Sequence, residues 1–477
     1  MPNKKRTESD SLGVKKIDSK RLWGAQTQRS LENFKIGNNK IPDEIIVALG
    51  HQKKASVLAN HSLGLINSKL TKAITKACDQ IINLSLIDEF PLSVWQTGSG
   101  TQTNMNANEV ISNYAIKILK GKVGSKIPIH PNDHVNLSQS SNDTFPTIMH
   151  ISANELTDSK LIPSLKKLIS ELKKKTKSYS KIVKIGRTHT QDATPLTMGD
   201  EFSGYLNQIE NNFERIKLSK KELNYLAQGG TAVGSGINAP KNFDKVFCKF
   251  LNKFTINNYK PAKNKFEAIA SHDSLVNFSN SLNTLAVSLL KILNDLRFLS
   301  SGPRSGLGEI NIPANEPGSS IMPGKVNPTQ IEALSMICTQ VMGNNLAVSL
   351  AGSQGHFELN AFKPVIIFNV INSINLLSDG IQSFCTNCLE GITLNKDNIN
   401  KHVQNSLMLV TALAPVIGYN KAAEMAKLAH KKGISLTEAN IILKYVDPKK
   451  MKQILDDYSQ IIDVTPDPKK IEGNKKD

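Results

Sequence analysis

The stretch SHDSLVNFSNSLNTLAVSLLKILNDLRFLSS, residues 271–301, decides the fold class. Its apolar residues recur at alternating spacings of three and four, which is the period of an α-helix with one apolar stripe. The residues of this stripe are Leu275, Phe278, Leu282, Leu285, Leu289, Ile292, Leu296 and Leu299. The stretch therefore predicts a long helix that packs against other helices along its whole length.

Three further segments carry the same kind of stripe. Their stripe residues are Leu161, Leu165, Leu168 and Leu172; Phe202, Leu206, Ile209, Phe213 and Ile216; and Val370, Ile374, Leu377, Ile381, Phe384 and Cys388. Several long helices in one region predict a helix bundle, and the fold class is mainly α. A helix of ~30 residues is about 45 Å long, more than an average domain is wide, so we expect a homo-oligomer.

The length of 477 residues is enough for about three domains. Composition changes near residues 137 and 395, so we expect a mixed, mostly helical domain at 1–137, the long-helix bundle at 138–395 and a small helical domain at 396–477. The last part, residues 467–477, has the composition of a charged tail. Short extended pieces are expected near residues 12–25 and 305–313. Glycine patterns typical of dinucleotide or P-loop sites do not occur, and the apolar runs are too short for a membrane span.

The formal net charge of +18 raises the question of nucleic-acid binding. The excess comes from 52 lysines against seven arginines, scattered in pairs and triplets, whereas base and phosphate recognition relies on arginine and interleaved aromatic residues. A solvated basic surface that attracts small anions is therefore favoured over a specific nucleic-acid partner, which remains an alternative.

Cysteine usage and the N-terminus indicate the compartment. The five cysteines are few and odd in number, which suits a reducing environment, and the single pair Cys385 and Cys388 has no second pair at zinc spacing. The polar start of the chain, with Glu8 and Asp10, resembles neither a signal nor a transit peptide. We expect buried thiols and a cytoplasmic protein.

Polar segments that interrupt the helical chain carry the candidate chemistry. In QTGSGTQTNMNANEV, residues 96–110, Gly98 and Gly100 allow the backbone to approach a ligand and Ser99 and Thr101 offer hydroxyls, although an ordinary N-capped loop would look similar. The stretch HPNDHVNLSQSSNDTFP, residues 130–146, is too dense in polar side chains for turn formation alone.

Two alternatives concern the histidines of these segments. A metal held by His130, Asp133 and His134 is conceivable, but the spacing fits no compact ligand pattern, so no metal is expected. In GRTHTQDATPLTMGDEF, residues 186–202, His189 lies between two threonines before an expected Pro-containing helix start. It is a candidate general acid or base, and a structural histidine is the alternative.

The most informative segment is GSSIMPGKVNP, residues 318–328. Its glycines and prolines surround two serines and Lys325 in a loop without acidic residues. Backbone N–H groups together with one lysine suit a carboxylate, and also the negative charge that develops when a neighbouring C–H loses its proton. A plain surface loop is the alternative. A fifth segment, residues 352–364, is expected to have a supporting role.

Together these strings resemble the fumarase/aspartase superfamily from about Arg21 to Lys432, and within it the class II fumarases. The resemblance implies a three-domain, mainly helical subunit, a homotetramer built on a twenty-helix core, active sites shared among three subunits, and no cofactor, metal or iron–sulfur cluster. It implies reversible hydration of fumarate to L-malate. An aspartate ammonia-lyase of the same superfamily, or a catalytically silent structural homologue, is the alternative.

The resemblance also implies roles for individual residues. Ser319 corresponds to the base that removes the C3 proton, His189 to the residue that acts on the leaving hydroxyl through a water, and Glu332 to the partner of His189. Lys126 and the stretch His130, Pro131, Asn132 and Asp133 correspond to a secondary anion site, where Leu137 departs from the usual lysine. The residues expected to bind substrate are Ser99, Gly100, Thr101, Lys126, Ser140, Ser141, Asn142, Thr188, Ser320, Lys325, Val326 and Asn327.

Overall fold

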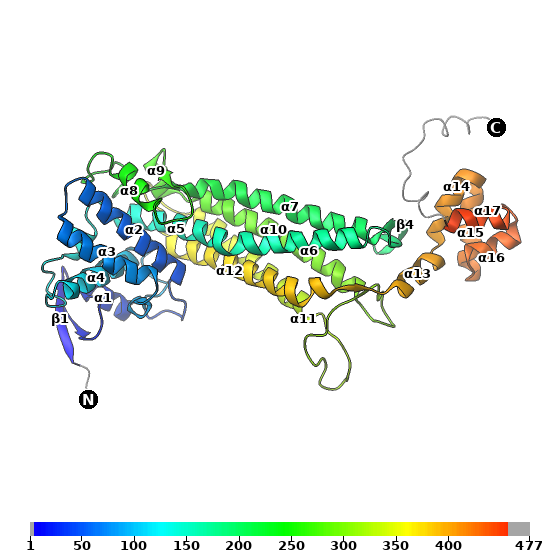
Figure 1. Cartoon of the computed structure of the whole chain (residues 1–477), viewed down its shortest axis with the longest axis horizontal. Coiled ribbons are helices and arrows are strands. Elements are labelled where there is room, and N and C mark those ends of the chain that lie inside the picture. Colours follow the sequence, from blue (N-terminus) through cyan, green and yellow to red (C-terminus); the bar gives the residue numbers. More distant parts are fainter. Residues whose placement is uncertain (1–3, 457–477) are drawn as a thin grey trace. The chain divides into compact units, whose positions relative to one another are not determined.

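A computed structural model describes residues 4–456, and these residues form a mainly helical protein, as predicted (Figure 1). They divide into two compact units. The first consists of residues 4–165, 211–289 and 334–381, and the second of residues 166–210, 290–333 and 382–456. The predicted charged tail, residues 467–477, lies outside the described residues.

The N-terminal part of the first unit packs shorter helices around α2. This helix contacts α3, α5 and α8, and α4 contacts α3 and α5. The hairpin β1–β2 is antiparallel, and β5 and β6 form a short parallel pair. The elements are β1 (Lys5–Asp10), β2 (Gly13–Asp18), α1 (Ala25–Asn33), α2 (Asp43–Ser62), α3 (Ser68–Ile82), η1 (Ile87–Glu89), α4 (Thr101–Ile118), η2 (Pro131–Val135), α5 (Ser141–Leu156), η3 (Thr157–Leu161), η4 (Lys221–Asn224), β5 (Tyr225–Leu226), α8 (Phe243–Leu251), β6 (Lys260–Pro261) and α9 (Lys265–Ala270).

Five long helices each run across the division between the units. They are α6 (Ile162–Ser178), α7 (Met198–Lys220), α10 (Asp273–Leu299), α11 (Thr329–Gly352) and α12 (Lys363–Asn387). All eight stripe residues of α10 are buried, as are the predicted stripes at 161–172 and in α12, so these predictions are confirmed. By length and composition α12 could span a membrane, but 61% of its apolar window is buried in the structure, as in a core helix.

The stripe of α7 differs from the prediction. Tyr205 and Asn212 are buried where Leu206 and Phe213 are only half-buried. The Tyr205 hydroxyl lies 2.9 Å from carboxylate oxygens of Glu201 and Asp295, so its polar end is satisfied inside the protein. Hydropathy alone predicts that Leu206 and Phe213 face the interior. It cannot predict that Tyr205 and Asn212 are buried in their place, because that depends on hydrogen-bond partners inside the protein.

The second unit contains a β-hairpin and a small group of helices at the end of the described chain. A separate apolar core joins these helices to Ile185 of β3. The antiparallel pairs are β3 with β4 and β7 with β8. The elements are β3 (Val183–Thr188), β4 (Gln191–Thr197), β7 (Ile310–Asn311), η5 (Leu389–Gly391), β8 (Thr393–Leu394), α13 (Lys396–Asn405), η6 (Leu407–Leu409), α14 (Val410–Ile417), α15 (Tyr419–Lys432), α16 (Leu436–Leu443) and α17 (Pro448–Asp456).

Two local expectations need correction. The segment around His189 was expected to lead into a Pro-containing helix start, but Pro195 lies in strand β4 and α7 begins at Met198. The extended piece expected at residues 12–25 begins earlier, as the hairpin of residues 5–18. In both places strand pairing supplies hydrogen bonds that short-range sequence patterns do not reveal. The five cysteines are buried and free, as predicted.

The α10 seam makes a stability prediction. Phe278→Ala removes a fully buried ring and is expected to lower the free energy of unfolding by about 3–5 kcal/mol. Asn280→Ala, at an exposed position of the same helix, is the control and should change it by less than about 0.5 kcal/mol. Urea unfolding followed by circular dichroism measures both, and equal losses would contradict the assigned seam.

Candidate active site

The segment before α4 holds its residues by close packing of glycines. Gly100 caps α4 in a left-handed conformation, with φ of 74°, and an added Cβ would lie 2.2 Å from the Phe145 ring. A Cβ on Gly98 would lie 1.4 Å from the carbonyl oxygen of Ala361. Gly98 thus permits close approach of residues 98 and 361 of the chain. The result fixes Ser99 and Thr101 at the start of a helix.

The structure brings Thr101 and Ser141 together. Their hydroxyl oxygens lie 2.8 Å apart, and the Asn104 side-chain amide donates to Ser141 Oγ at 2.9 Å. The same amide group donates to Asn136 Oδ1 at 3.2 Å. Two predicted substrate-binding residues from separate segments therefore form one polar cluster at the N-termini of α4 and α5, where backbone N–H groups favour anions.

The start of α5 is fixed by a capping box. Ser140 caps the helix, and its backbone N–H donates to Asp143 Oδ1 at 2.9 Å. The buried Asp143 also accepts from the backbone N–H groups of Gly229 and Thr231. Burial raises the pKa of Asp143 to about 6, although these hydrogen bonds and Lys53 act in the opposite direction. Asn142 donates to the carbonyl oxygen of Ala232 at 2.8 Å.

The predicted secondary anion residues lie beside the N-terminal hairpin. His130 caps η2, where its Nδ1 accepts from the backbone N–H groups of Asn132 and Asp133. Lys126 Nζ donates to the carbonyl oxygen of Ser9 at 2.8 Å. A cavity of about 30 Å³ beside them, with Pro131 and Asn132 in its wall, is too small to enclose a dicarboxylate. The secondary anion site stays a prediction.

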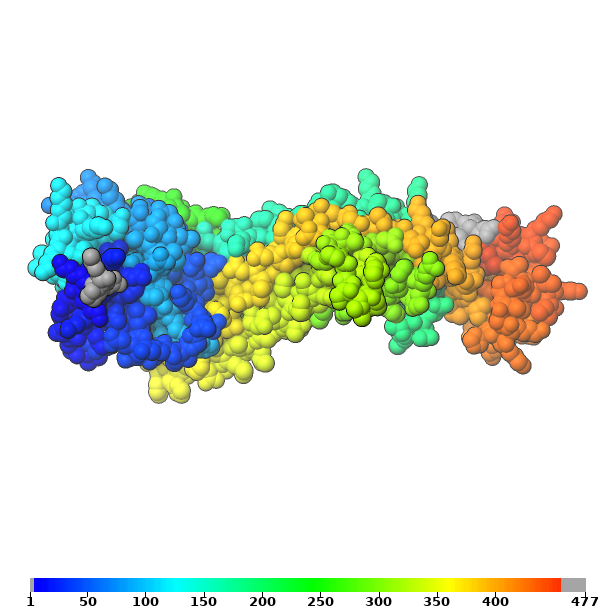
Figure 2. Space-filling model, turned by 90° about the horizontal axis from the view of Figure 1, so that it is seen from below, coloured from blue at the N-terminus to red at the C-terminus, as the bar shows by residue number. Residues whose placement is uncertain are grey.

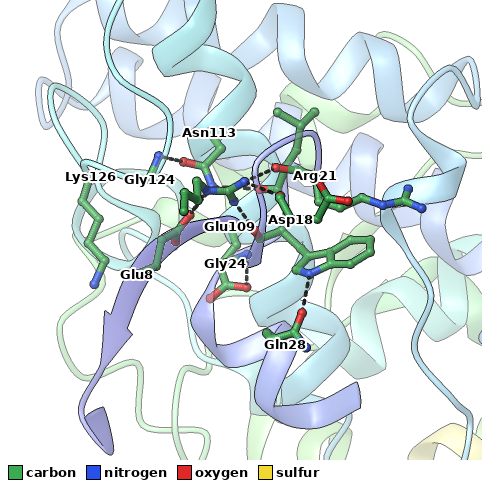
Figure 3. Close-up of polar contacts among 12 residues, drawn as sticks. Glu8, Asp18, Arg21, Gly24, Gln28, Glu109, Asn113, Gly124 and Lys126 are labelled. Atoms are coloured by element: carbon green, nitrogen blue, oxygen red, sulfur yellow. Dashed lines mark hydrogen bonds and ion pairs between the residues drawn. The ribbon is translucent and has the colours of Figure 1, made fainter. Parts of the chain in front are cut away.

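Hydrogen bonds fix the chain around that cavity (Figure 3). Glu109 accepts from the backbone N–H groups of Gly24, Gln26 and Thr27 and so holds the start of α1. Asn113 accepts from the backbone N–H of Gly124 and donates to the carbonyl oxygen of Leu22. The segment that carries Lys126 is thereby tied to α4.

His189 occupies the tip of the β3–β4 hairpin. Thr188 pairs with Gln191, and the two residues between them have positive φ, 54° for His189 and 61° for Thr190. Glycine and asparagine favour such a turn, whereas a β-branched threonine is strained in it. The Thr190 hydroxyl donates to the His189 carbonyl oxygen. The strained turn leaves the imidazole exposed.

A buried carboxylate anchors this hairpin. The Glu309 side chain is 0% exposed; Arg187 donates to its Oε1 at 2.5 Å, and Lys184 Nζ lies 3.3 Å from Oε2. His402 of α13 lies 2.9 Å from Oε1. Burial raises the pKa of Glu309, but the hydrogen bond from Arg187 and the other cations outweigh it and leave the pKa below its ordinary value. Arg187 is two residues before His189 in the chain. The ion pair of Arg187 with Glu309 therefore holds strand β3 next to the turn that carries His189.

The segment 318–328 forms an exposed irregular loop before α11, lime green in Figure 2. Gly318 and Gly324 have φ of 84° and 81°, and a Cβ on Gly318 would lie 2.0 Å from the Lys325 carbonyl oxygen. Gly318 and Pro323 form an isolated antiparallel bridge that closes this loop, and within the described chain the backbone N–H group of Ser320 has no hydrogen-bond partner. Loop geometry thus leaves this N–H donor free in the same loop as the exposed Lys325 and Val326 and the half-buried Asn327.

The predicted site residues are divided between the two units of the chain. Those at 99–142 belong to the first unit, and Thr188, His189, 318–328 and Glu332 belong to the second. Glu332 contacts Arg297 at 3.2 Å, and among residues 4–456 no hydrogen bond joins it to His189. Within the single chain, therefore, the predicted pairing of His189 with Glu332 is not made.

Comparison with known proteins identifies the family. A model described as "Lyase" matches residues 13–343, and one described as "Fumarase C C-terminus" matches residues 409–458. A protein named fumarate hydratase class II from Rickettsia conorii is 57% identical over 450 residues, 94% of this chain and 97% of that protein. The chain belongs to the class II fumarate hydratase family. A relative of the same name from Brucella suis is 57% identical over 91% of this chain and 94% of its own length.

Solved structures give the same assignment. The crystal structure of a class II fumarase from Schistosoma mansoni matches with a TM-score of 0.92 and 44% identity, covering 95% of this chain and 98% of that one. The fold predicted from the resemblance, mainly helical and fumarase-like, is therefore confirmed.

The sequence did not point to several residues that organise the candidate site of this class II fumarate hydratase family member. Asn104 and Asn136 connect the predicted hydroxyls, and Lys53 lies beneath them. Arg187 and Glu309 support the hairpin of His189. Asn104 and Arg187 lie inside the quoted motifs, but their partners come from 32 and 122 residues away, so no local signal could pair them. Lys53 stands between Gln52 and Lys54, so no local signal distinguished it from a surface lysine.

The histidines of residues 130–134 are the candidates for metal binding. No group of three or more His, Cys, Asp or Glu side chains within residues 4–456 is arranged to hold a metal ion. His130 uses its Nδ1 as a helix cap, and His134 accepts from the His130 backbone N–H at 2.9 Å. The metal independence expected for the family member stays a prediction that chelation tests.

The Glu309 anchor predicts a pH-dependent loss of stability. Its pKa in the folded protein is below the ordinary 4.5, so its contribution is complete above that pH and is lost as the pH falls. Glu309→Gln leaves the partly buried Arg187 without its carboxylate, while Lys184 keeps its ion pair with Glu201, and should cost roughly 3 kcal/mol at pH 7. Urea unfolding at pH 7 and at pH about 3.5 measures the free energy of unfolding of both proteins. The difference between wild type and Glu309→Gln should be smaller at the lower pH.

The control for this prediction is an exposed ion pair. Glu214 lies 2.9 Å from Lys217 with 60% of its side chain exposed, so Glu214→Gln should change stability by less than about 0.5 kcal/mol. If Glu309→Gln lowered the free energy of unfolding equally at both pH values, the contribution of Glu309 would not depend on the charge of its carboxylate, and the prediction would be contradicted.

Proposed function

We propose that this protein is a fumarate hydratase that reversibly hydrates fumarate to L-malate, a reaction of the tricarboxylic acid cycle, in the cytoplasm. The observation that carries the proposal is the loop 318–328. It combines two left-handed glycines, an unengaged N–H group at Ser320 and the exposed Lys325. In a chain so similar to class II fumarate hydratases, this arrangement supports binding of a dicarboxylate and of the dianion formed from it.

The proposed chemistry needs a base, an anion site and an acid. In the direction from L-malate to fumarate, the ionised Ser319 Oγ takes the C3 proton and becomes a hydroxyl, and the electron pair of the C–H bond moves into the adjacent carboxylate. The loop N–H groups and the Lys325 ammonium stabilise the resulting aci-carboxylate. His189, through a water, protonates the departing hydroxyl as the C–O bond breaks, so that fumarate and water leave. Glu332 would then act on His189 from a neighbouring chain.

Substrate carboxylates are proposed to bind the hydroxyl and amide cluster at the starts of α4 and α5 together with the loop. The cluster at Thr101 and Ser141 supports this, since both hydroxyls lie at helix N-termini. Ser99, Gly100, Ser140, Asn142, Thr188, Ser320, Val326 and Asn327 complete the proposed set.

We also propose that the site is completed by association of four chains, with three contributing to each site. His189 and the loop 318–328 are exposed in one chain, as expected for parts that await other subunits. Large apolar side chains on α10 and α11 are exposed as well, including Val287 at 52%, Leu346 at 62% and Leu350 at 59%. Five long helices in each of four chains would form the twenty-helix core.

Activity tests the function directly. Chelator-treated protein mixed with L-malate should generate fumarate, followed by its ultraviolet absorbance. Ser319→Ala and His189→Asn should each lower kcat by at least ~10², the scale lost with one essential polar group. Ser85→Ala, at an exposed position on a distant turn, is the control and should leave kcat unchanged.

The same assay separates the alternatives. Turnover of fumarate only in the presence of ammonium would indicate an aspartate ammonia-lyase, and no turnover in either direction would indicate a silent homologue. Wild-type kcat in the Ser319 variant would refute its role as base.

Light scattering tests the assembly. The wild-type protein should have about four times the 52.3 kDa of one chain. Leu346→Glu should reduce that mass and the activity together, because a charge replaces an apolar contact. Leu12→Glu, at a 77% exposed position in the β1–β2 turn, should do neither. A monomeric, active wild-type protein would exclude a shared site.

A further inference from the structure

Lys53 of α2 is a lysine without a carboxylate partner in the interior of the first unit. Its side chain is almost fully buried, with 1% of the residue exposed. Its Nζ lies 2.9 Å from Gln139 Oε1 and 3.2 Å from Asn136 Oδ1. Among residues 4–456 no carboxylate is within ion-pair distance of it. A buried ammonium held by two amide oxygens needs a reason, because its desolvation is costly.

The ammonium group fixes the orientation of Asn136. Lysine has three N–H donors and no acceptor, so only the Oδ1 of Asn136 can face it. That oxygen also accepts from the side-chain amides of Asn104 at 3.2 Å and Asn108 at 3.1 Å. The Asn136 amide group donates in the other direction, to the carbonyl oxygen of Gln139. Lys53 therefore determines which end of the Asn136 amide meets its neighbours.

This orientation continues to the predicted substrate-binding hydroxyls. Because Asn136 Oδ1 faces Asn104, Asn104 must present its NH₂ group, whose second hydrogen goes to Ser141 Oγ at 2.9 Å. A serine oxygen that accepts from an amide keeps its own hydrogen for another acceptor. That acceptor is Thr101 Oγ1, 2.8 Å away, or an incoming anion. Either way the Thr101 and Ser141 pair presents a hydroxyl hydrogen outward.

We propose that Lys53 is a positioning residue for substrate capture: through Asn136 and Asn104, its ammonium group directs the hydroxyl hydrogens of Ser141 and Thr101 toward a substrate carboxylate. The inference rests on the proposed dicarboxylate site. It adds the reason why hydroxyls, which can donate or accept, act there as donors. With the opposite orientation of Asn104, its oxygen would take the Ser141 hydrogen and the pair would lose a donor.

The charges around Lys53 determine how the effect depends on pH. Burial lowers the pKa of Lys53 to about 7, while the carboxylate of Asp143 in α5 acts in the opposite direction. Burial raises the pKa of Cys78 to about 12, so it stays a thiol, and Asp143, with a pKa of about 6, is ionised above that pH. The facing side chains of α4 and of residues 136–139 are neutral amides. The charge of Lys53 is therefore present below about pH 7 and lost above it.

The test compares substrate affinity in variants of the full-length protein. Lys53→Met keeps the length of the side chain and removes its charge and donors. At pH about 6.5 it should raise KM for L-malate and Kd for succinate, an unreactive dicarboxylate measured by calorimetry, about tenfold, the scale of one charge-assisted hydrogen bond. The change in kcat should be less than about threefold, because proton transfer is done elsewhere. The ratio of variant to wild-type Kd should shrink at pH about 8.5, where Lys53 is neutral in both.

The control and the second variant make the outcome decisive. Lys54→Met changes the neighbouring lysine, which pairs with Asp79 at 2.6 Å, and should leave both constants unchanged. Asn136→Leu, at a half-buried position, removes the hydrogen bonds that link Lys53 to Asn104 while Lys53 itself remains. If Lys53→Met does not fold, the substrate affinity of Asn136→Leu tests the inference instead. The double variant Lys53→Met with Asn136→Leu should raise KM and Kd no further than the single variants do, because both substitutions interrupt the same chain of hydrogen bonds.

Three results would overturn the inference. They are unchanged succinate binding in the variants, a loss that is the same at both pH values, and a loss of kcat without a change in KM. Wild-type turnover of L-malate, measured in parallel, judges the proposed function separately. If turnover is absent but succinate binds, the Lys53 inference is still decided by Kd.

Discussion

The burial of one apolar stripe along each long helix is the constraint on which the rest of the structure depends. A helix of 27 residues such as α10 extends for about 40 Å and cannot cover its own stripe, so parallel neighbours must do so. Polar chemistry is then confined to the segments where helices begin. Residues 99–101 lead into α4, residues 140–142 into α5 and residues 318–328 into α11. Unpaired N–H groups at these starts give the anion-binding tendency that the proposed reaction uses.

The polar interior is organised by groups with a fixed hydrogen-bonding direction. Asn and Gln side chains can present either end, and hydroxyls can donate or accept, so a network of them alone has no defined polarity. Lys53 can only donate and Asp143, when ionised, can only accept. Lys53 orients the side-chain amides of Gln139 and Asn136, and Asp143 orients the backbone N–H groups of Ser140, Gly229 and Thr231. Their charges do not meet in an ion pair, which leaves each free to orient amides and N–H groups.

The hairpin of His189 shows how strain and support occur together. Two consecutive residues with positive φ are unfavourable for His and Thr, and nothing local compensates. The compensation comes from Glu309, which binds Arg187, two residues before the tip, and Lys184, near the start of β3. A carboxylate buried in this way depends on its cationic partners, because an unpaired buried charge is strongly destabilising. The exposed imidazole thus depends on residues that never touch it.

The amino-acid sequence by itself determined the helical seams, the polar segments and the family. Periodicity is a local property, so the stripes of α10 and α12 follow from spacing alone, and the motifs at 96–110, 130–146 and 318–328 identify themselves by composition. Only the tertiary structure decided which partners these segments have. Asn104 with Asn136, Gly98 with Ala361, and Arg187 with Glu309 are separated by tens to hundreds of residues. Their pairing depends on packing and on the direction of each hydrogen bond, and neither is encoded in any one stretch of the chain.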